Sequence, residues 1–231
     1  MILTKNLRVD ELGEPLFEKV NLVIRPGERI GVVSTGEKED EVLLRAIAGE
    51  VEADEGSVTH EGERIAYIPL DLIEEGEGAL ARVLHARPTF LIINAAEVSA
   101  AGIEALARFI RGFRGGILLA SEDATLMQAA KVSRIVEIQT HTKTVSLFTG
   151  NYADFVIERE KNQARVNAAY EKQQRAKRRL EDWLTQKRAE ASINRSPEIG
   201  ATIRSKTKYL QREILDKEIP KPFEDPEPEP E

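Results

Sequence analysis

Residues 28–50, ERIGVVSTGEKEDEVLLRAIAGE, decide how this chain is expected to fold. Together with the six residues before it, the stretch predicts two strands within 22–34, on either side of a Pro-Gly turn. From Glu39 the apolar residues take helical spacing, and Gly49 marks the end of that helix. A buried strand that leads through a short loop into a helix is therefore expected at the start of the domain.

The segments downstream repeat this alternation of apolar runs and helical patterns. The sequence predicts a strand at 64–69, a helix and an apolar strand separated by Pro88 within 79–96, a helix and a strand within 101–121, and a hairpin at 133–150. Apolar strands without polar alternation are typical of a mostly parallel sheet covered by helices. We therefore expect an α/β domain over 1–150.

From Asn151 onward the pattern becomes purely helical. No Gly or Pro interrupts residues 151–190, a break follows at 192–200, and a second helix carries Ile199, Ile203, Leu210 and Ile214 on one side. Two helices joined by a short loop predict a long antiparallel hairpin over 151–217. Residues 218–231 are rich in proline and acid, so we expect them to be disordered.

Composition excludes several kinds of site. The chain has no cysteine, and its three histidines are scattered, so we expect neither disulfides nor a metal site. No apolar run approaches the ~18 residues that a membrane span needs, and the N-terminus lacks a secretory pattern. The sequence therefore predicts a metal-free cytoplasmic protein that does not act at a membrane.

The net charge of −7 is distributed unevenly. Residues 1–150 hold 16 basic and 24 acidic residues, residues 151–217 hold 16 and 10, and residues 218–231 hold 1 and 6. A basic segment within an acidic protein indicates an anionic partner for that segment.

Four stretches resemble the ABC-F family of ATP-binding cassette proteins, and together they span nearly the whole chain up to about Pro222. They are residues 28–58, 62–71, 79–123 and FTGNYADF at 148–155, whose GNY is similar to the exit from the first ABC-F cassette into its arm. The resemblance implies a P-loop-NTPase-like (ABC) cassette followed by a coiled-coil arm, with ATP and Mg²⁺ as the family's cofactors. Only 18 residues, 72–89, remain for the helical subdomain, so most of it is expected to be missing, together with the LSGGQ signature.

The residues that carry the family's chemistry are replaced in this chain. A phosphate-binding loop needs glycines, a lysine for the phosphates and Ser or Thr for Mg²⁺. Ser34, Glu37 and Glu39 stand at the glycine positions. The remaining replacements are Asp40 for the lysine, Glu41 for the Ser or Thr, Leu70 for the Q-loop glutamine, Asn94 for the Walker B aspartate, Ala95 for the catalytic carboxylate and Glu122 for the switch histidine.

Carboxylates in such a loop oppose nucleotide binding. A carboxylate ~4 Å from a phosphate charge costs about 4 kcal/mol at an effective dielectric constant near 20, which is roughly a thousandfold in affinity. We therefore expect no catalytic residues, no nucleotide and no cofactor, and we interpret the cassette as a pseudo-ATPase.

The hairpin is then the candidate binding surface. Residues 172–212 contain twelve basic and four acidic residues. Lys and Arg spaced along a helix can follow phosphates, and arginine adds bidentate contacts and stacking. The ABC-F arm touches P-site tRNA and ribosomal RNA, so the resemblance implies the ribosome, rRNA or tRNA as partners. The predicted RNA-binding residues are Arg175, Lys177, Arg178, Arg179, Lys187, Arg188, Arg195, Arg204, Lys206 and Lys208.

Other interpretations stay open at this point. The basic face could simply be solvated; Leu180, Trp183 and Leu184 are expected to pack the two helices together, whereas Tyr209 could serve packing or stacking. The cassette could still bind ATP beside a second cassette from another chain. It could also be an interaction scaffold that modulates a full-length ABC-F relative, or a decayed or altered sequence. Ribosome or tRNA binding without ATP hydrolysis, acting on translation, is the leading hypothesis.

Overall fold

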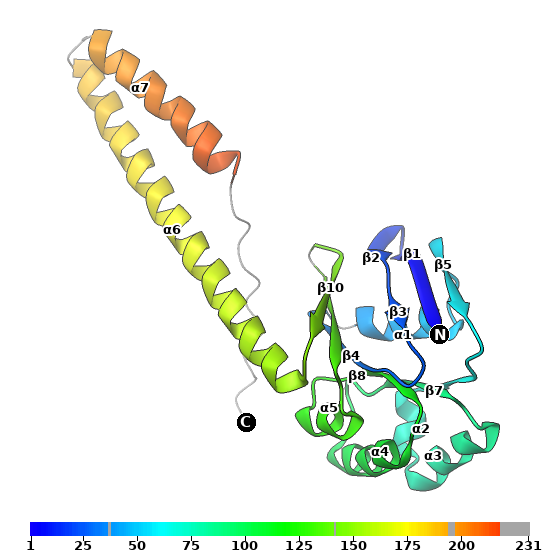
Figure 1. Ribbon diagram of the computed structural model, residues 1–231. Helices are drawn as coiled ribbons and strands as arrows, with labels where there is room; N and C mark the ends of the chain where they lie inside the picture. The colour runs from blue at the N-terminus through cyan, green and yellow to red at the C-terminus, as the bar shows by residue number, and fades with distance from the viewer. Residues whose placement is uncertain (37, 141, 194–196, 218–231) are drawn as a thin grey trace. The chain divides into compact units, whose positions relative to one another are not determined.

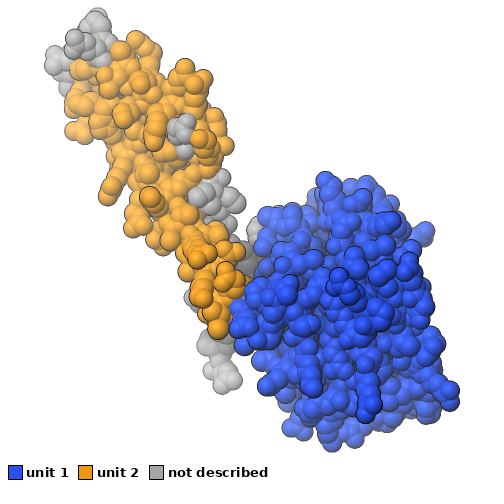
Figure 2. Space-filling view, in the orientation of Figure 1, with its two compact units in different colours: residues 1–156 blue, residues 157–231 orange. Residues whose placement is uncertain are grey.

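The computed structural model describes residues 1–36, 38–140, 142–193 and 197–217. The chain forms two compact units, residues 1–156 and 157–231 (Figure 2). The tail at 218–231, for which the sequence predicts disorder, lies outside the described residues, as do Glu37 and Arg195.

The core of the first unit is a six-stranded sheet (Figure 1). Its strand order is β10-β9-β4-β8-β7-β6, in which only the β9–β10 pair is antiparallel. The strand within residues 28–50 is β4. It lies between β8 and β9, and both of these strands come later in the chain. The bounds are β4 (Arg29–Ser34), β6 (Ile65–Ile68), β7 (Phe90–Asn94), β8 (Gly116–Ala120), β9 (Arg134–Gln139) and β10 (Thr144–Thr149).

Helices and a second sheet bury both faces of the parallel strands, which explains why their sequences are apolar throughout. On β8, Ile117 and Leu119 pack on one side, with the helices α2–α5, whereas Leu118 and Ala120 face the other side, with α1. Figure 1 shows α2 to α5 gathered on one side of the sheet. The bounds are α1 (Glu39–Ala48), α2 (Leu70–Glu74), α3 (Glu77–Val83), η1 (Leu84–Ala86), α4 (Ala100–Gly112) and α5 (Ala124–Ala130).

A four-stranded antiparallel sheet covers the α1 side of the first unit. It comprises β1 (Ile2–Glu11), β2 (Glu14–Val20), β3 (Val23–Ile24) and β5 (Glu55–His60), and β1 pairs with the other three. The pairings of β1 with β2 and with β5 both contain register shifts. Such bulges blur the two-residue periodicity by which a strand is found in a sequence, and the segments 14–20 and 55–60 are not predicted as strands above.

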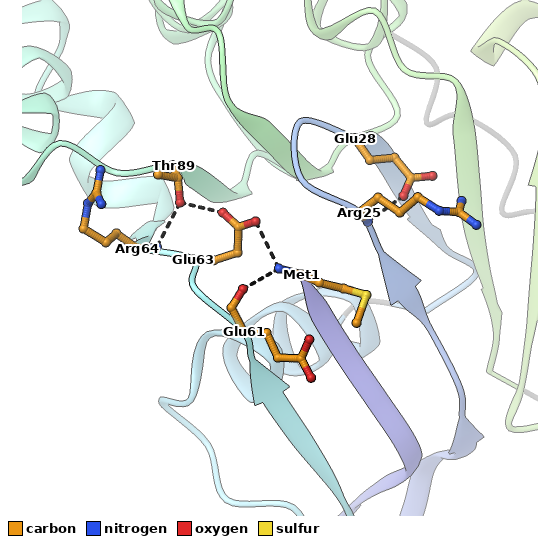
Figure 3. Close-up of polar contacts among 7 residues, drawn as sticks. All are labelled: Met1, Arg25, Glu28, Glu61, Glu63, Arg64 and Thr89. Atoms are coloured by element: carbon orange, nitrogen blue, oxygen red, sulfur yellow. Dashed lines mark hydrogen bonds and ion pairs between the residues drawn. The ribbon is translucent and has the colours of Figure 1, made fainter.

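Polar contacts join this sheet to the loops around β6 and β7 (Figure 3). The Met1 ammonium donates to the Glu61 carbonyl at 2.6 Å and to Glu63 Oε1 at 3.1 Å. Thr89 Oγ1 donates to Glu63 Oε2 at 2.5 Å and accepts from the Arg64 N–H. The Thr89 hydroxyl, followed by the Met1 ammonium, holds the pKa of Glu63 below its usual value. These contacts hold Met1, the residue before β1, in place.

The second unit consists of the distal part of α6 (Tyr152–Ile193), α7 (Pro197–Tyr209) and a π-helix, η2 (Leu210–Leu215). α7 lies alongside α6 (Figure 1), and the Gln173 amide donates to the Lys217 carbonyl at 2.7 Å. Leu184, Leu210 and Ile214 form a small buried cluster. Leu180, Trp183, Ile203 and Leu215 pack against it.

The α/β cassette class and the long helix predicted from the sequence are both present. Only α2, α3 and η1 connect β6 to β7, which agrees with the short 72–89 segment. Within the described residues, no helix is both long enough and apolar enough to cross a membrane.

Truncating the buried leucine of the hairpin tests this packing. Leu184 is 3% exposed, so Leu184→Ala should lower the free energy of opening of residues 197–215 by about 2 kcal/mol. Amide hydrogen exchange on α7 measures this change. Leu12→Ala is the matched control because Leu12 is fully exposed; equal protection of α7 in both variants would contradict the packing.

Candidate functional site

The predicted replacement residues lie along one edge of the six-stranded sheet. The ladder pairs Ile68 with Ile93 and Asn94 with Ala120, and Val32 with Ala120, so β4, β6, β7 and β8 end at similar heights. After these strands come Asp40 and Glu41 in the first turn of α1, Leu70 at the start of α2, and Ala95 and Glu122 in loops, while Asn94 is the last residue of β7. Open α/β sheets bind ligands at the carboxyl edge, where the strand order switches. This edge is therefore the candidate site.

The Glu39 carboxylate lies close to the backbone at Gly36, between β4 and α1. Its Oε2 accepts from the Lys38 N–H at 3.3 Å, and a Cβ added at Gly36 would collide with this carboxylate and with the Thr140 hydroxyl. Glu39 is only 5% exposed. A carboxylate of the chain thus lies against the loop backbone, where a bound anion would otherwise accept from N–H groups.

Asp40 completes this arrangement at the start of α1. Its Oδ1 accepts from the Glu41 N–H at 2.9 Å, and the side chain is buried. Burial, and after it the neighbouring carboxylates of Glu39 and Glu41, raises the pKa of Asp40 above its ordinary value. The positive end of the helix dipole favours negative groups here, and the first turn of α1 supplies three of them itself.

Two threonines hold the loop against the end of β9. The Thr35 N–H donates to the Ile138 carbonyl at 3.1 Å, and Thr35 Oγ1 accepts from the Thr140 N–H at 3.1 Å. The Ser34 hydroxyl oxygen accepts from the Gly36 N–H at 3.1 Å. These bonds fix the loop conformation that places the Glu39 carboxylate.

Lys38, the residue before α1, forms an ion pair at the end of β1. Lys38 Nζ lies 3.3 Å from Glu11 Oε1 at the end of β1, and both side chains are largely exposed. A surface ion pair of this kind contributes little stability.

Neutral groups stand at the end of β7. The Tyr67 hydroxyl hydrogen-bonds the Asn94 side chain, and Ala95 is 2% exposed with its N–H bonded to the Ala120 carbonyl. Burial, followed by the charges of Glu41 and Glu50, raises the pKa of Tyr67 to about 12, so the phenol stays protonated at neutral pH. An amide, a methyl group and a neutral phenol supply no general base for water.

Leu70 and Glu122 follow β6 and β8. Leu70 begins α2. Glu122 is exposed, and its backbone carbonyl accepts from the Tyr152 hydroxyl at 2.8 Å. Across the described residues, no group of three or more acidic, histidine or cysteine side chains could hold a metal ion.

Some of the predicted RNA-binding residues interact with other side chains of the hairpin, whereas others form no ion pair with a carboxylate within the described residues. Arg175 pairs with Glu171 at 3.6 Å and Lys187 with Glu190 at 2.5 Å. Lys177 is partly buried and has an interaction partner. Lys206 lies over the Tyr209 ring, 5.8 Å from its centroid. Within the described ranges, the exposed cations without an ion pair to a carboxylate include Arg178, Arg179, Arg188, Arg204 and Lys208.

Comparison with known proteins identifies the fold class. A family model described as "ABC transporter" matches residues 138–226. No curated protein sequence matches the chain.

Three solved structures are similar to it. The dimeric, post-hydrolysis ATP-binding cassette MJ0796 with ADP and Pi has a TM-score of 0.52 and 12% identity, over 64% of this chain and 98% of that one. CbiO1 of Clostridium perfringens, part of the ABC transporter complex cbiONQ, has a TM-score of 0.52 and 11% identity, over 72% and 94%. A nucleotide-free cassette from an ABC transporter has a TM-score of 0.53 and 10% identity, over 68% and 95%.

The first unit is therefore an α/β domain of the P-loop type. More narrowly, it has the fold of an ATP-binding cassette, which is what likeness at 10–12% identity establishes.

The raised pKa of Asp40 gives a stability prediction with a defined sign. Because burial disfavours the charged carboxylate, Asp40→Asn should raise the free energy of unfolding at pH 7 by about 1 kcal/mol, the order of a typical single substitution. The gain should shrink as the pH falls through the folded-state pKa toward the unfolded value of 3.8, and disappear below that value, where the Asp40 carboxyl is neutral in both the folded and the unfolded state.

Urea denaturation at pH 7 and pH 4 measures this difference. Exposed Asp71 provides the control, since Asp71→Asn should bring no such gain. A lower stability of Asp40→Asn at pH 7 would show that charge at the helix N-terminus outweighs burial.

Proposed function

We propose that this chain is an ABC-F-like protein whose cassette does not bind or hydrolyse nucleotide, and whose basic hairpin binds ribosomal or transfer RNA to influence translation. It would act in the cytoplasm, where its RNA partners are. The proposal that the cassette binds no nucleotide rests on the Glu39 carboxylate, which accepts a hydrogen bond from the Lys38 N–H and lies against Gly36.

Electrostatics supports the absence of nucleotide binding. A triphosphate at this loop would meet Glu39, Asp40 and Glu41 in the first turn of α1. Each carboxylate within ~4 Å of a phosphate charge opposes binding by about 4 kcal/mol at an effective dielectric constant near 20. Neither Asn94 nor Ala95 offers a carboxylate to a magnesium ion or to an attacking water.

Calorimetry with Mg-ATP tests whether the cassette binds nucleotide. The chain should show no binding heat at nucleotide concentrations up to about 1 mM, because two or more carboxylate contacts would raise Kd beyond that range. An intact ATP-binding cassette in the same buffer is the positive control. Micromolar affinity of this chain would contradict the proposal.

The charge of the hairpin supports RNA as its partner. Arg178, Arg179, Arg188 and Arg204 are exposed, and within the described part of the chain none forms an ion pair with a carboxylate. An unpaired guanidinium can bind a phosphate without first breaking an existing pair. Each phosphate so neutralised releases counterions, which makes such binding sensitive to salt.

Charge reversal at these four arginines tests whether the hairpin binds RNA. The variant in which Arg178, Arg179, Arg188 and Arg204 are all replaced by Glu should bind ribosomes at least about 100-fold more weakly, with a shallower dependence on salt. Co-sedimentation with ribosomes at two salt concentrations measures both quantities.

A control with the same change in net charge separates the hairpin from the total charge. It replaces four exposed cations of the first unit, Lys5, Arg25, Arg111 and Arg114, by Glu. This control should keep most of the affinity. An equal loss in the two variants, or no loss in the hairpin variant, would contradict the proposal.

A further inference from the structure

The last residue of α7 is an exposed aromatic side chain. Tyr209 is 53% exposed. It does not belong to the apolar cluster of the hairpin, in which Ile203, Leu210 and Ile214 of the same segment pack toward α6. Packing within the described hairpin therefore does not account for a tyrosine at this position.

Most charged residues near Tyr209 in the sequence are positive. Residues 199–212 contain four cations and no acidic residue, and Glu213 and Asp216 follow this range. Lys206, Lys208 and Arg212 lie within one turn of Tyr209 and are exposed. Lys206 Nζ lies 5.8 Å from the ring centroid, an arrangement in which the cation and the ring face attract each other.

The backbone changes directly after Tyr209. The helix widens from α to π geometry at Leu210, and the π segment continues to Leu215. Tyr209 retains α-helical dihedral angles, with φ −63° and ψ −47°, so its ring lies at the junction between the two helix types.

We propose that Tyr209 is a stacking platform for an unpaired RNA base, with Lys206, Lys208 and Arg212 contacting the adjoining phosphates. This inference rests on the proposed function and narrows it to single-stranded or looped RNA. Proteins bind such RNA by stacking splayed bases on aromatic rings beside basic groups that follow the backbone. Bases within an A-form duplex are already stacked on each other and offer no face to Tyr209.

The test uses the full chain and two labelled RNA probes, a 12-nucleotide oligo(A) and a 12-base-pair duplex. Tyr209→Ala should weaken binding to oligo(A) about tenfold, while the slope of log Kd against log salt stays unchanged because no cation is removed. Binding to the duplex should not change. Tyr209→Phe keeps the ring and should bind as the unaltered chain does.

Tyr170→Ala is the matched control, because Tyr170 is a partly buried tyrosine on α6 of the same unit. Helicity and melting temperature of each variant establish that the hairpin is intact. The stacking inference is wrong if Tyr209→Ala binds oligo(A) as tightly as the unaltered chain, or if its affinity for both probes falls equally. In either case the hairpin can still bind RNA. If the unaltered chain binds neither probe nor ribosomes at low salt, the proposed function fails, and this inference with it.

Discussion

The interaction on which the candidate site depends is the contact of the Glu39 carboxylate with the loop backbone before α1. The first N–H groups of a helix have no partner within it and need acceptors. Here Glu39 accepts from the Lys38 N–H and Asp40 from the Glu41 N–H. Two N–H groups at a helix start of the kind that can serve as an anion site thus donate to side chains of the helix's own first turn.

The neighbouring strand ends are consistent with this arrangement. If this edge binds neither a phosphate nor a metal ion, as we propose, no carboxylate is required after β7; the residues found there are Asn94 and Tyr67. The Tyr152 hydroxyl instead donates to the Glu122 carbonyl, which links the loop after β8 to the first turn of α6. In our account the cassette serves as a scaffold, and RNA binding lies on the hairpin.

The sequence predicted the parallel sheet because burial of both faces leaves unbroken apolar runs, as in β7 and β8, and it predicted the long helix from a stretch without Gly or Pro. It missed β2 and β5, whose pairing with β1 is irregular. It placed carboxylates at the loop but did not predict the contact of the Glu39 carboxylate with the backbone at Gly36, since that contact depends on the hydrogen bonds of Thr35 and Thr140. The pairing of Arg175 and Lys187 with acids one turn away had a detectable signal in the i,i+3 and i,i+4 spacing.

The most direct test of this account is a crystal structure of the chain grown in the presence of Mg-ATP. The account predicts the Glu39 carboxylate against Gly36 and no triphosphate density along residues 34–41. A triphosphate bound there, with Glu39 turned out to solvent, would contradict it.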